Sequence, residues 1–126
     1  MYAFVTLGTN NLEKSSNFYD EILKILDIIS VDKDENYVGY AKEKSNNLAD
    51  FYIMKPFDKN IATNGNGTMI SFFVKSKKKV DEFHKKALSL GAVNEGSPGP
   101  RHGKNYYAYL RDLDGNKICA YTTSKI

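Results

Sequence analysis

Few residues in this chain could carry out acid–base, nucleophilic or metal chemistry. The 126 residues include two histidines, His84 and His102, and a single cysteine, Cys119. Of the 18 basic residues only Arg101 and Arg111 are arginines, the side chain best suited to bidentate binding of anions. One cysteine cannot form an internal disulfide, and zinc sites built from cysteine pairs are also excluded. These five residues are therefore the first candidates for a functional site.

Three of these residues allow both a functional and a structural interpretation. Cys119 could be a nucleophile if a base lowered its pKa, but the sequence places neither histidine beside it, which favours a structural cysteine. His84 falls beside the apolar stripe of a predicted helix, which favours a semi-buried structural histidine. Arg111 could bind a ligand anion, or it could pair with Asp112 or Asp114 across a turn.

Arg101 and His102 follow a segment rich in glycine and proline, residues 96–100, which we expect to be a loop. This loop leads directly into a tyrosine-rich segment. Such a loop can form the rim or lid of a binding site, or it can be an ordinary surface loop.

Composition limits the class of protein. With 41% hydrophobic and 26% charged residues, the chain is typical of a soluble globule, although nine Tyr and seven Phe without any Trp are unusual. A net charge of +3 is too weak to indicate nucleic-acid binding by itself. No apolar run approaches the roughly 20 residues of a membrane span, and the N-terminus lacks the pattern of a signal peptide. We therefore expect a cytoplasmic protein with neither a membrane nor a nucleic-acid partner.

The elements that must position these residues begin with a strand over residues 2–7. Asn10 and Glu13 have capping-box spacing and predict the start of a helix. Further strands are expected near 28–32, 36–42 and 50–54, separated by turn-rich pieces such as residues 44–47. Residues 58–67 read as a loop. The apolar stripe of the helix consists of Leu12, Phe18, Tyr19, Ile22, Leu23, Ile25 and Leu26.

The second half repeats this plan. Residues 68–75 predict a strand, Ser76 can cap a helix, and Gly91 ends it. Strands at about 105–111 and 117–123 follow, joined by a turn at 112–116. The apolar face of this helix consists of Val80, Phe83, Ala87 and Leu88.

A shift of 65 residues aligns the two halves. The aligned pairs are Phe4 with Met69, Phe18 with Phe83, Leu23 with Leu88, Ile53 with Ile118, and Met54 with Cys119. The sequence therefore predicts an α+β fold of two βαβββ modules, about 1–57 and 68–126, joined by a loop at 58–67 within a single domain, 1–126.

Alternation along the strands separates residues that face the helices from residues that face away. If the two modules turn their free faces together, these residues line a cup, and Arg101 and His102 add to its rim. A cup of phenols, apolar groups and a guanidinium suits a small, partly apolar ligand, although the same side chains could pack a second core. The residues predicted to face away are Phe4, Thr6, Tyr52, Met54, Met69, Ser71, Phe73, Tyr107, Tyr109, Arg111, Cys119 and Tyr121.

Several segments resemble the vicinal oxygen chelate superfamily, which includes glyoxalase I, bleomycin-resistance proteins and extradiol dioxygenases. The resemblance lies in Phe-Val-Thr-Leu-Gly at 4–8, Leu-Glu-Lys-Ser at 12–15, Gly-Ser-Pro-Gly at 96–99 and Arg-Asp-Leu-Asp-Gly-Asn-Lys-Ile at 111–118. The last segment is similar to the closing motif Arg-Asp-Pro-Asp-Gly-Asn-x-Ile-Glu of that superfamily. The resemblance implies paired βαβββ modules that form a curved mixed sheet around a cup, within a homodimer.

Enzymes of this superfamily hold a divalent metal with His or Glu on the first, fourth, fifth and eighth strands. The resemblance places Phe4, Met54 (or Tyr52), Met69 and Cys119 at these positions. Phenylalanine cannot ligate a metal, and thioethers are poor ligands for hard or borderline ions, so we expect no such metal and no cofactor. A soft Cu(I) site at Met54, Met69 and Cys119 is an alternative to ordinary core packing of these residues.

The leading functional prediction is a protein that binds a small molecule without a metal. One alternative is a superfamily enzyme, a lactoylglutathione-lyase-like lyase or isomerase or a dioxygenase, that uses non-standard ligands or the tyrosines and His102 as acids and bases. A minor alternative is single-strand RNA binding, since the aromatic segment 107–110 near Lys104 resembles an RNA-recognition strand. No catalytic residue is assigned.

Overall fold

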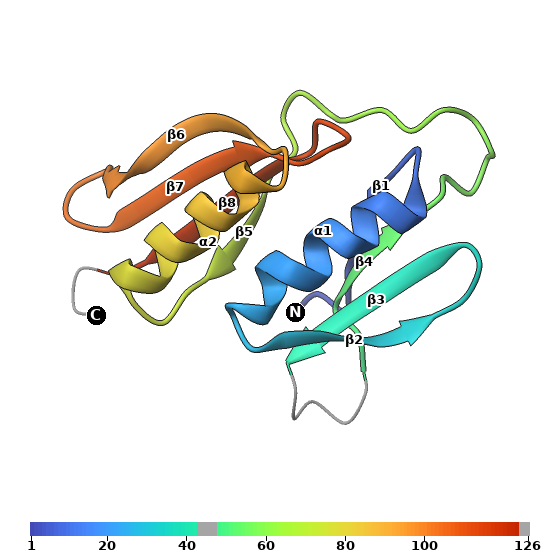
Figure 1. Cartoon of the computed structure of the whole chain (residues 1–126), viewed down its shortest axis with the longest axis horizontal. Coiled ribbons are helices and arrows are strands. Elements are labelled where there is room, and N and C mark those ends of the chain that lie inside the picture. The colour runs from blue at the N-terminus through green and yellow to red at the C-terminus, as the bar shows by residue number, and fades with distance from the viewer. Residues whose placement is uncertain (43–47, 124–126) are drawn as a thin grey trace. The chain divides into compact units, whose positions relative to one another are not determined.

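The computed structural model describes residues 1–42 and 48–123. Two compact units, Met1–Asn64 and Gly65–Ile126, each consist of one helix and a four-stranded mixed sheet (Figure 1). The predicted α+β class with two βαβββ modules is confirmed. The boundary between the units falls inside the predicted loop at 58–67. The predicted turn at 44–47 lies outside the described residues.

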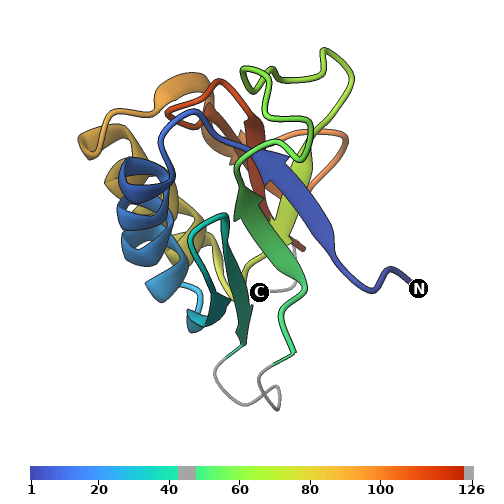
Figure 2. The same ribbon diagram turned by 90° about the vertical axis from the view of Figure 1, so that its right-hand side faces the viewer.

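The first unit contains β1 (Val5–Gly8), α1 (Leu12–Lys24), β2 (Ile28–Lys33), β3 (Tyr37–Lys42) and β4 (Phe51–Met54). Its sheet has the order β1-β4-β3-β2, with β1 parallel to β4 and the other pairs antiparallel. In Figure 2, β1 and β4 run side by side in the same direction, and α1 covers one face of their sheet. The opposite face is the free face of this unit.

Helix α1 begins one residue later than the capping-box spacing predicted. The cap is Asn11, whose backbone is extended and whose Oδ1 accepts a hydrogen bond from the Lys14 amide at 3.0 Å. Asn10 instead binds the segment after β4. Its Oδ1 accepts from the Ala62 amide at 2.7 Å, and its Nδ2 donates to the Ala62 carbonyl at 3.2 Å. Asn10 therefore holds this segment against the start of the helix.

The core of the first unit lies between α1 and the sheet. Phe18, Tyr19, Ile22, Leu23 and Leu26 of the predicted stripe are buried, while Leu12 and Ile25 are half-buried. Each fully buried side chain of this kind contributes about 1.5–3 kcal/mol. The strands supply Val38, Tyr40, Phe51 and Ile53 to the same core.

Tyr40 is a polar member of this core and lies wholly buried. Its hydroxyl donates to Asp20 Oδ1 at 2.9 Å and approaches the Ser16 carbonyl at 3.2 Å. Burial and the Asp20 carboxylate both disfavour the phenolate, and they raise the pKa of Tyr40 far above its ordinary value. This phenol therefore fastens β3 to α1 and takes no part in a site.

The second unit contains β5 (Ile70–Phe73), α2 (Lys77–Ser89), β6 (Val93–Pro100), β7 (Tyr106–Arg111) and β8 (Lys117–Thr122). Its sheet has the order β5-β8-β7-β6, with β5 parallel to β8. The predicted cap is confirmed, because Ser76 Oγ accepts from the Lys79 amide at 3.2 Å. Gly91, at φ +106°, adopts the left-handed conformation that ends the helix. The core contains Val80, Phe83, Ala87, Ala108, Leu110, Ile118 and Ala120.

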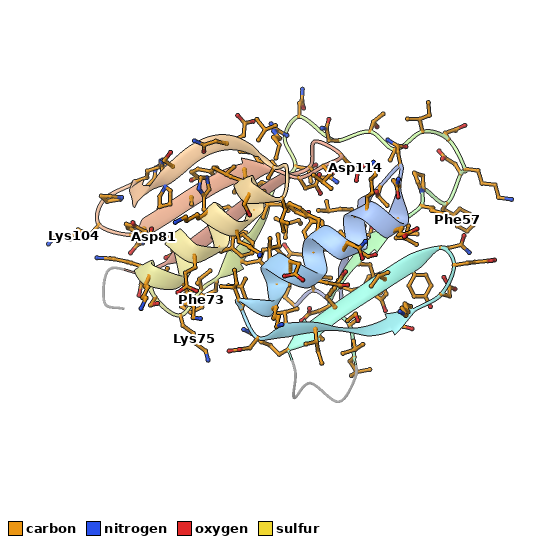
Figure 3. The ribbon with its side chains drawn as sticks, viewed as in Figure 1. Phe57, Phe73, Lys75, Asp81, Lys104 and Asp114 are labelled. Atoms are coloured by element: carbon orange, nitrogen blue, oxygen red, sulfur yellow. The ribbon has the colours of Figure 1, made fainter. Side chains whose placement is uncertain are left out.

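The prediction of a loop at 96–100 is wrong. These residues form the second half of β6, and Gly99 and Pro100 pair with Tyr107 and Tyr106. The ladder shifts register between Asn94 and Gly96 and again between Gly96 and Gly99. An edge strand tolerates proline, and glycines accommodate such bulges, so the composition of a loop conceals a strand. The hairpin loop is residues 101–105, and Lys104 lies at its tip (Figure 3).

The shift of 65 residues relates the bounds of α1 to those of α2, and those of β1 to those of β5. The strands that follow the helices need a different shift. Thr6 pairs with Tyr52 in the first unit, and its equivalent Ser71 pairs with Cys119 in the second. Tyr52, rather than Met54, is therefore the equivalent of Cys119. By the same register Ile53 matches Ala120, not Ile118.

Candidate functional site

Aromatic side chains cover the free face of the second sheet, opposite α2. We call Phe73, Tyr107, Tyr109 and Tyr121 the tyrosine face. The Tyr107 ring lies 5.0 Å from that of Tyr121 and 6.0 Å from that of Tyr109, the latter pair nearly parallel at 12°. Phe73 extends the face, with its ring 6.1 Å from Tyr121 (Figure 3). The predicted alternation of β5, β7 and β8 thus brings these residues together.

The hydroxyls of the tyrosine face have no partner within the described part of the chain. Tyr107, Tyr109 and Tyr121 make no hydrogen bond there through their phenol oxygens, although all three rings are half-buried. The contrast is Tyr106 on the opposite side of β7, whose hydroxyl donates to Asp81 Oδ1 at 2.7 Å. Three phenols on one face are therefore available to donate to, or accept from, a bound molecule.

Two cations lie over the Tyr109 ring. The Arg101 guanidinium carbon is 5.2 Å from the ring centroid, and Lys117 Nζ is 5.3 Å from it. Arg101 also donates to the carbonyls of Tyr107 at 2.8 Å and Ser97 at 2.6 Å. Those bonds fix the guanidinium across the β6–β7 hairpin, so Arg101 shapes the face and adds positive charge to it.

Gly96 makes room for this arrangement. A Cβ atom there would lie 2.9 Å from Tyr109 Cδ2 and 3.2 Å from the Arg101 NH2 nitrogen. A side chain at position 96 would therefore push Tyr109 or Arg101 out of place.

Arg111 does not pair with Asp112 or Asp114 as one interpretation predicted. Its Nε donates to Glu95 Oε1 at 2.6 Å, and a terminal nitrogen donates to the Gly115 carbonyl at 3.1 Å. Arg111 lies opposite Val93 on β6, which brings Glu95 of the same strand within reach. The Asp112 carboxylate instead accepts from the amides of Asp114 and Asn116, both at 2.9 Å. The hydrogen bond from Arg111 lowers the pKa of Glu95.

Cys119 lies in the same sheet, between Ser71 on β5 and Tyr109 on β7, and is only 1% exposed. Burial raises the pKa of its thiol, against smaller lowering effects of a hydrogen bond with Ser71 and the charges of Arg101 and Lys117. A buried thiol with a raised pKa is a poor nucleophile. This geometry favours the structural interpretation of Cys119.

Native Cys119 is expected to react with iodoacetamide at least about a hundredfold more slowly than the same thiol in urea, because reaction requires local opening. The rate can be followed by mass spectrometry. The raised pKa also predicts that stability is unaffected below the pKa of the unfolded thiol and falls as the pH rises toward that of the folded thiol. Urea titrations of Cys119→Ala should lack this alkaline component, and equally rapid labelling with and without urea would contradict the buried position.

The other predicted residues of the second unit lie at the margins of the tyrosine face. His102 sits in the hairpin loop at φ +53°, exposed, with its ring edge 5.5 Å from Tyr107. Met69 precedes β5 and is 42% exposed. Whether these residues contact a ligand stays a prediction.

A second aromatic group lies on the free face of the first unit. The Tyr52 ring is 5.3 Å from Phe4 and 5.4 Å from Tyr37, and its hydroxyl donates to Asp32 Oδ2 at 3.2 Å. Thr6 and Met54 flank Tyr52 on the same side of β1 and β4. The charge of Asp32, followed by that of Asp34, raises the pKa of Tyr37. We call Phe4, Tyr37 and Tyr52 the Tyr52 cluster.

The first unit also has a half-open cavity that sequence reasoning missed. Its volume is about 820 Å³, and its lining includes Asp34, Tyr37, Met54, Phe57 and Ile61. Phe57, in the segment after β4, is 93% exposed (Figure 3). A smaller cavity of about 360 Å³ lies on this segment near Thr6. The signal in the sequence was a pair of apolar residues, Phe57 and Ile61, in a segment that otherwise reads as a polar loop.

The residues of the predicted cup therefore occupy two free faces, one in each unit. Phe4, Thr6, Tyr52 and Met54 lie in the first unit, and the remaining predicted residues lie in the second. Within each unit the predicted orientation away from the helix is confirmed for the strand residues. Their convergence on one cup stays a prediction, as does a soft-metal site at Met54, Met69 and Cys119.

The four positions of the expected metal ligands do not suit a divalent ion. They hold Phe4, Tyr52, Met69 and Cys119, of which phenylalanine has no donor atom and the thiol is buried and protonated. Among residues 1–42 and 48–123, no group of three or more His, Cys, Asp or Glu side chains could hold a metal ion. Over the same residues, no helix has the length and apolar character needed to cross a membrane.

Comparison with known proteins places these features in context. A family model described as the Glyoxalase/Bleomycin resistance protein/Dioxygenase superfamily matches residues 2–120. A glyoxalase/bleomycin resistance protein from Albidiferax ferrireducens is 36% identical, with a TM-score of 0.87 over 97% of this chain and 98% of that chain. A comparison with curated proteins gave no match.

Two more distant structures share the fold. A hypothetical protein from S. aureus is 23% identical, with a TM-score of 0.73 over 94% of this chain and 91% of that chain. A glyoxalase/bleomycin resistance protein/dioxygenase family enzyme from Burkholderia phytofirmans PsJN is 17% identical, with a TM-score of 0.76 over 96% of this chain and 97% of that chain.

Proposed function

Because the chain belongs to the glyoxalase/bleomycin resistance protein/dioxygenase superfamily, we propose that it binds a small, partly apolar organic molecule on the tyrosine face. Binding does not use the divalent metal that the superfamily resemblance implies. The observation that carries the proposal is the group of three phenol hydroxyls without partners among the described residues, on rings that already contact one another.

The tyrosine face has the two properties that small-molecule sites combine. Aromatic surfaces supply apolar contact area, and a few fixed polar groups orient the bound molecule. The rings of Tyr107, Tyr109 and Tyr121 supply the first property, and their hydroxyls supply the second. Arg101 holds the hairpin that carries two of these rings, so the face is formed before a ligand arrives.

Binding is better supported than acid–base catalysis by these tyrosines. A phenol that exchanges protons near neutral pH needs a lowered pKa. Burial, followed by the neighbouring Cys119, raises the pKa of Tyr109, and these effects outweigh the lowering by Arg101. A phenol with a raised pKa remains protonated and acts as a hydrogen-bond donor.

A homodimer remains part of this proposal, as the superfamily resemblance implies. The exposed aromatic residues Phe4 and Phe73 would suit such an interface as well as a ligand. Light scattering of the purified protein with and without a bound aromatic molecule distinguishes the two uses.

The direct test is binding of a neutral planar probe, 2-naphthamide, measured by calorimetry and by NMR of ring-labelled tyrosine. We expect Tyr107→Ala to weaken binding about tenfold, since one aromatic stacking contact is worth about 1–3 kcal/mol. Tyr106→Ala is the matched control on the same strand, because its side chain faces α2, and it should change the affinity less than about twofold.

Two results would contradict the proposal. Equal losses in Tyr107→Ala and Tyr106→Ala would show that the probe does not lie on the tyrosine face. Stoichiometric Zn, Fe or Mn in the purified protein, by elemental analysis, would contradict the metal-free part.

A further inference from the structure

We infer that the ligand of the tyrosine face is an organic anion whose acidic group is held by Lys117 and whose apolar part lies on the tyrosine rings. This inference rests on the proposed function and adds the charge of the ligand to it. It follows from how charge is divided between the units and from which charged groups of the second unit already have partners.

Charge is divided unequally along the chain. Residues 65–126 contain eleven Lys and Arg against five Asp and Glu, a formal charge of +6. Residues 1–64 contain seven Lys and Arg against ten Asp and Glu, a formal charge of −3. The modest total of +3 therefore conceals a strongly basic unit, and its field favours an anionic ligand.

On the tyrosine face this charge is local as well as general. Lys117 Nζ lies over the Tyr109 ring, and no hydrogen bond or ion pair of its ammonium occurs within the described residues. Arg101 adds a second positive charge to the same ring while its N–H groups bind carbonyls. The charges of Arg111 and Glu95 cancel in their ion pair. Lys117 is thus the cation on this face with donors to spare.

The carboxylates of the second unit are engaged elsewhere. Asp81 accepts from the Tyr106 hydroxyl on the α2 side of the sheet (Figure 3), and Glu82 pairs with Lys79 at 3.5 Å. Asp112 is buried in the β7–β8 turn. No carboxylate other than the paired Glu95 therefore accompanies Lys117 and Arg101 in the contacts of this face.

The phenols favour the same assignment. A protonated hydroxyl donates well to a carboxylate oxygen, and three such hydroxyls lie beside Lys117 and Arg101. The Tyr52 cluster is arranged differently, since Tyr52 already donates to Asp32 and the negative charges of Asp32 and Asp34 act on Tyr37. An anion is disfavoured there, so the inference applies to the second unit alone.

A single-stranded nucleic acid would also bring anions and planar rings. Proteins that bind such strands place several cations along the phosphate backbone, and their affinity falls steeply with salt. On the tyrosine face Lys117 is the one cation free of hydrogen bonds among the described residues. A small organic acid matches this number of cations better.

The test compares two probes of nearly equal shape, 2-naphthoate and 2-naphthamide, by calorimetry on the whole chain. We expect 2-naphthoate to bind about fivefold or more tightly than the amide, as a charged group adds to a hydrogen bond. Lys117→Met keeps the apolar stem and should remove most of that difference without weakening the amide. Lys85→Met, on the exposed surface of α2, removes the same net charge and should leave the difference nearly intact.

The outcomes separate the inference from the proposed function. If the amide binds as well as the carboxylate, the anion inference is overturned and the proposed function stands. If neither probe binds, the proposed function itself fails. Equal effects of Lys117→Met and Lys85→Met would overturn the role of Lys117, and displacement of 2-naphthoate by a salt-sensitive oligouridine would favour a nucleic acid instead.

Discussion

Replacing His84 by alanine is expected to lower the free energy of unfolding by about 3 kcal/mol, one of the two largest effects of a single substitution that we predict. His84 is 4% exposed, and its Nε2 lies 3.0 Å from Asn94 Oδ1 and 3.1 Å from the Tyr109 carbonyl oxygen. Both partners are acceptors, so Nε2 carries a proton and donates to them. Alanine would leave both acceptors without this donor and would open a cavity beneath β7.

The assignment of Asn94 is supported by its other bonds. The Gly96 amide donates to the same Oδ1 at 2.9 Å, and Nδ2 donates to Ser97 Oγ at 3.0 Å. His84 therefore holds the bulge of β6 that places Gly96 under the Tyr109 ring. The substitution should also broaden or shift the NMR signals of the Tyr109 ring, on the opposite face of the sheet.

The other histidine is the natural control. His102 is exposed, and His102→Ala should change stability by less than about 0.5 kcal/mol in urea titrations. A double-mutant cycle of His84→Ala with Asn94→Ala should give a coupling energy of about 1 kcal/mol. Additive effects of the two substitutions would mean that the hydrogen bond between them contributes nothing measurable.

A second large effect is expected for Gly39→Ala, which should lower the free energy of unfolding by about 2 kcal/mol. A Cβ atom at position 39 would lie 2.6 Å from Tyr52 Cε2 and 2.8 Å from the Ala49 methyl carbon. Gly39 pairs with Tyr52 across β3 and β4, and the Tyr52 ring lies over the glycine. The ring is held by Phe4 and Tyr37, so it cannot move aside without losing those contacts.

Gly99→Ala is the matched control, because nothing lies within 4 Å of a Cβ atom built at that position. Its effect on the urea midpoint should be small or slightly favourable, since alanine restricts the unfolded chain more than glycine does. If Gly39→Ala proves as mild as Gly99→Ala, the Tyr52 ring does not occupy the position described.

The helices and the faces of the strands were predictable from sequence because they depend on local periodicity. Phe18 and Phe83 recur at a spacing of 65 residues, and both are buried against their sheets. Ser76 was recognisable as a cap for the same local reason. The strand residues of the tyrosine face followed from alternation alone.

The features that failed prediction depend on contacts across the chain. Strand β6 has the composition of a loop, and only its pairing with β7 makes it a strand. Asn10 lost the role of helix cap because Ala62, 52 residues later, binds its side chain. Met54 was aligned with Cys119 by a constant shift, whereas the ladder registers include two further residues and select Tyr52.

The sequence by itself determined the family, the two helices, the residues on the free faces and the absence of the usual metal ligands from their positions. These properties are set by residue type and by spacing along the chain, as the lone Cys119 and the tyrosines of β7 illustrate. Only the tertiary structure decided the partners. It gave Arg111 to Glu95, Arg101 to the hairpin carbonyls and His84 to Asn94, and it left Lys117 as the available cation over Tyr109. Hydrogen bonds and ion pairs depend on distances between strands, and those distances are fixed only once the sheet has formed.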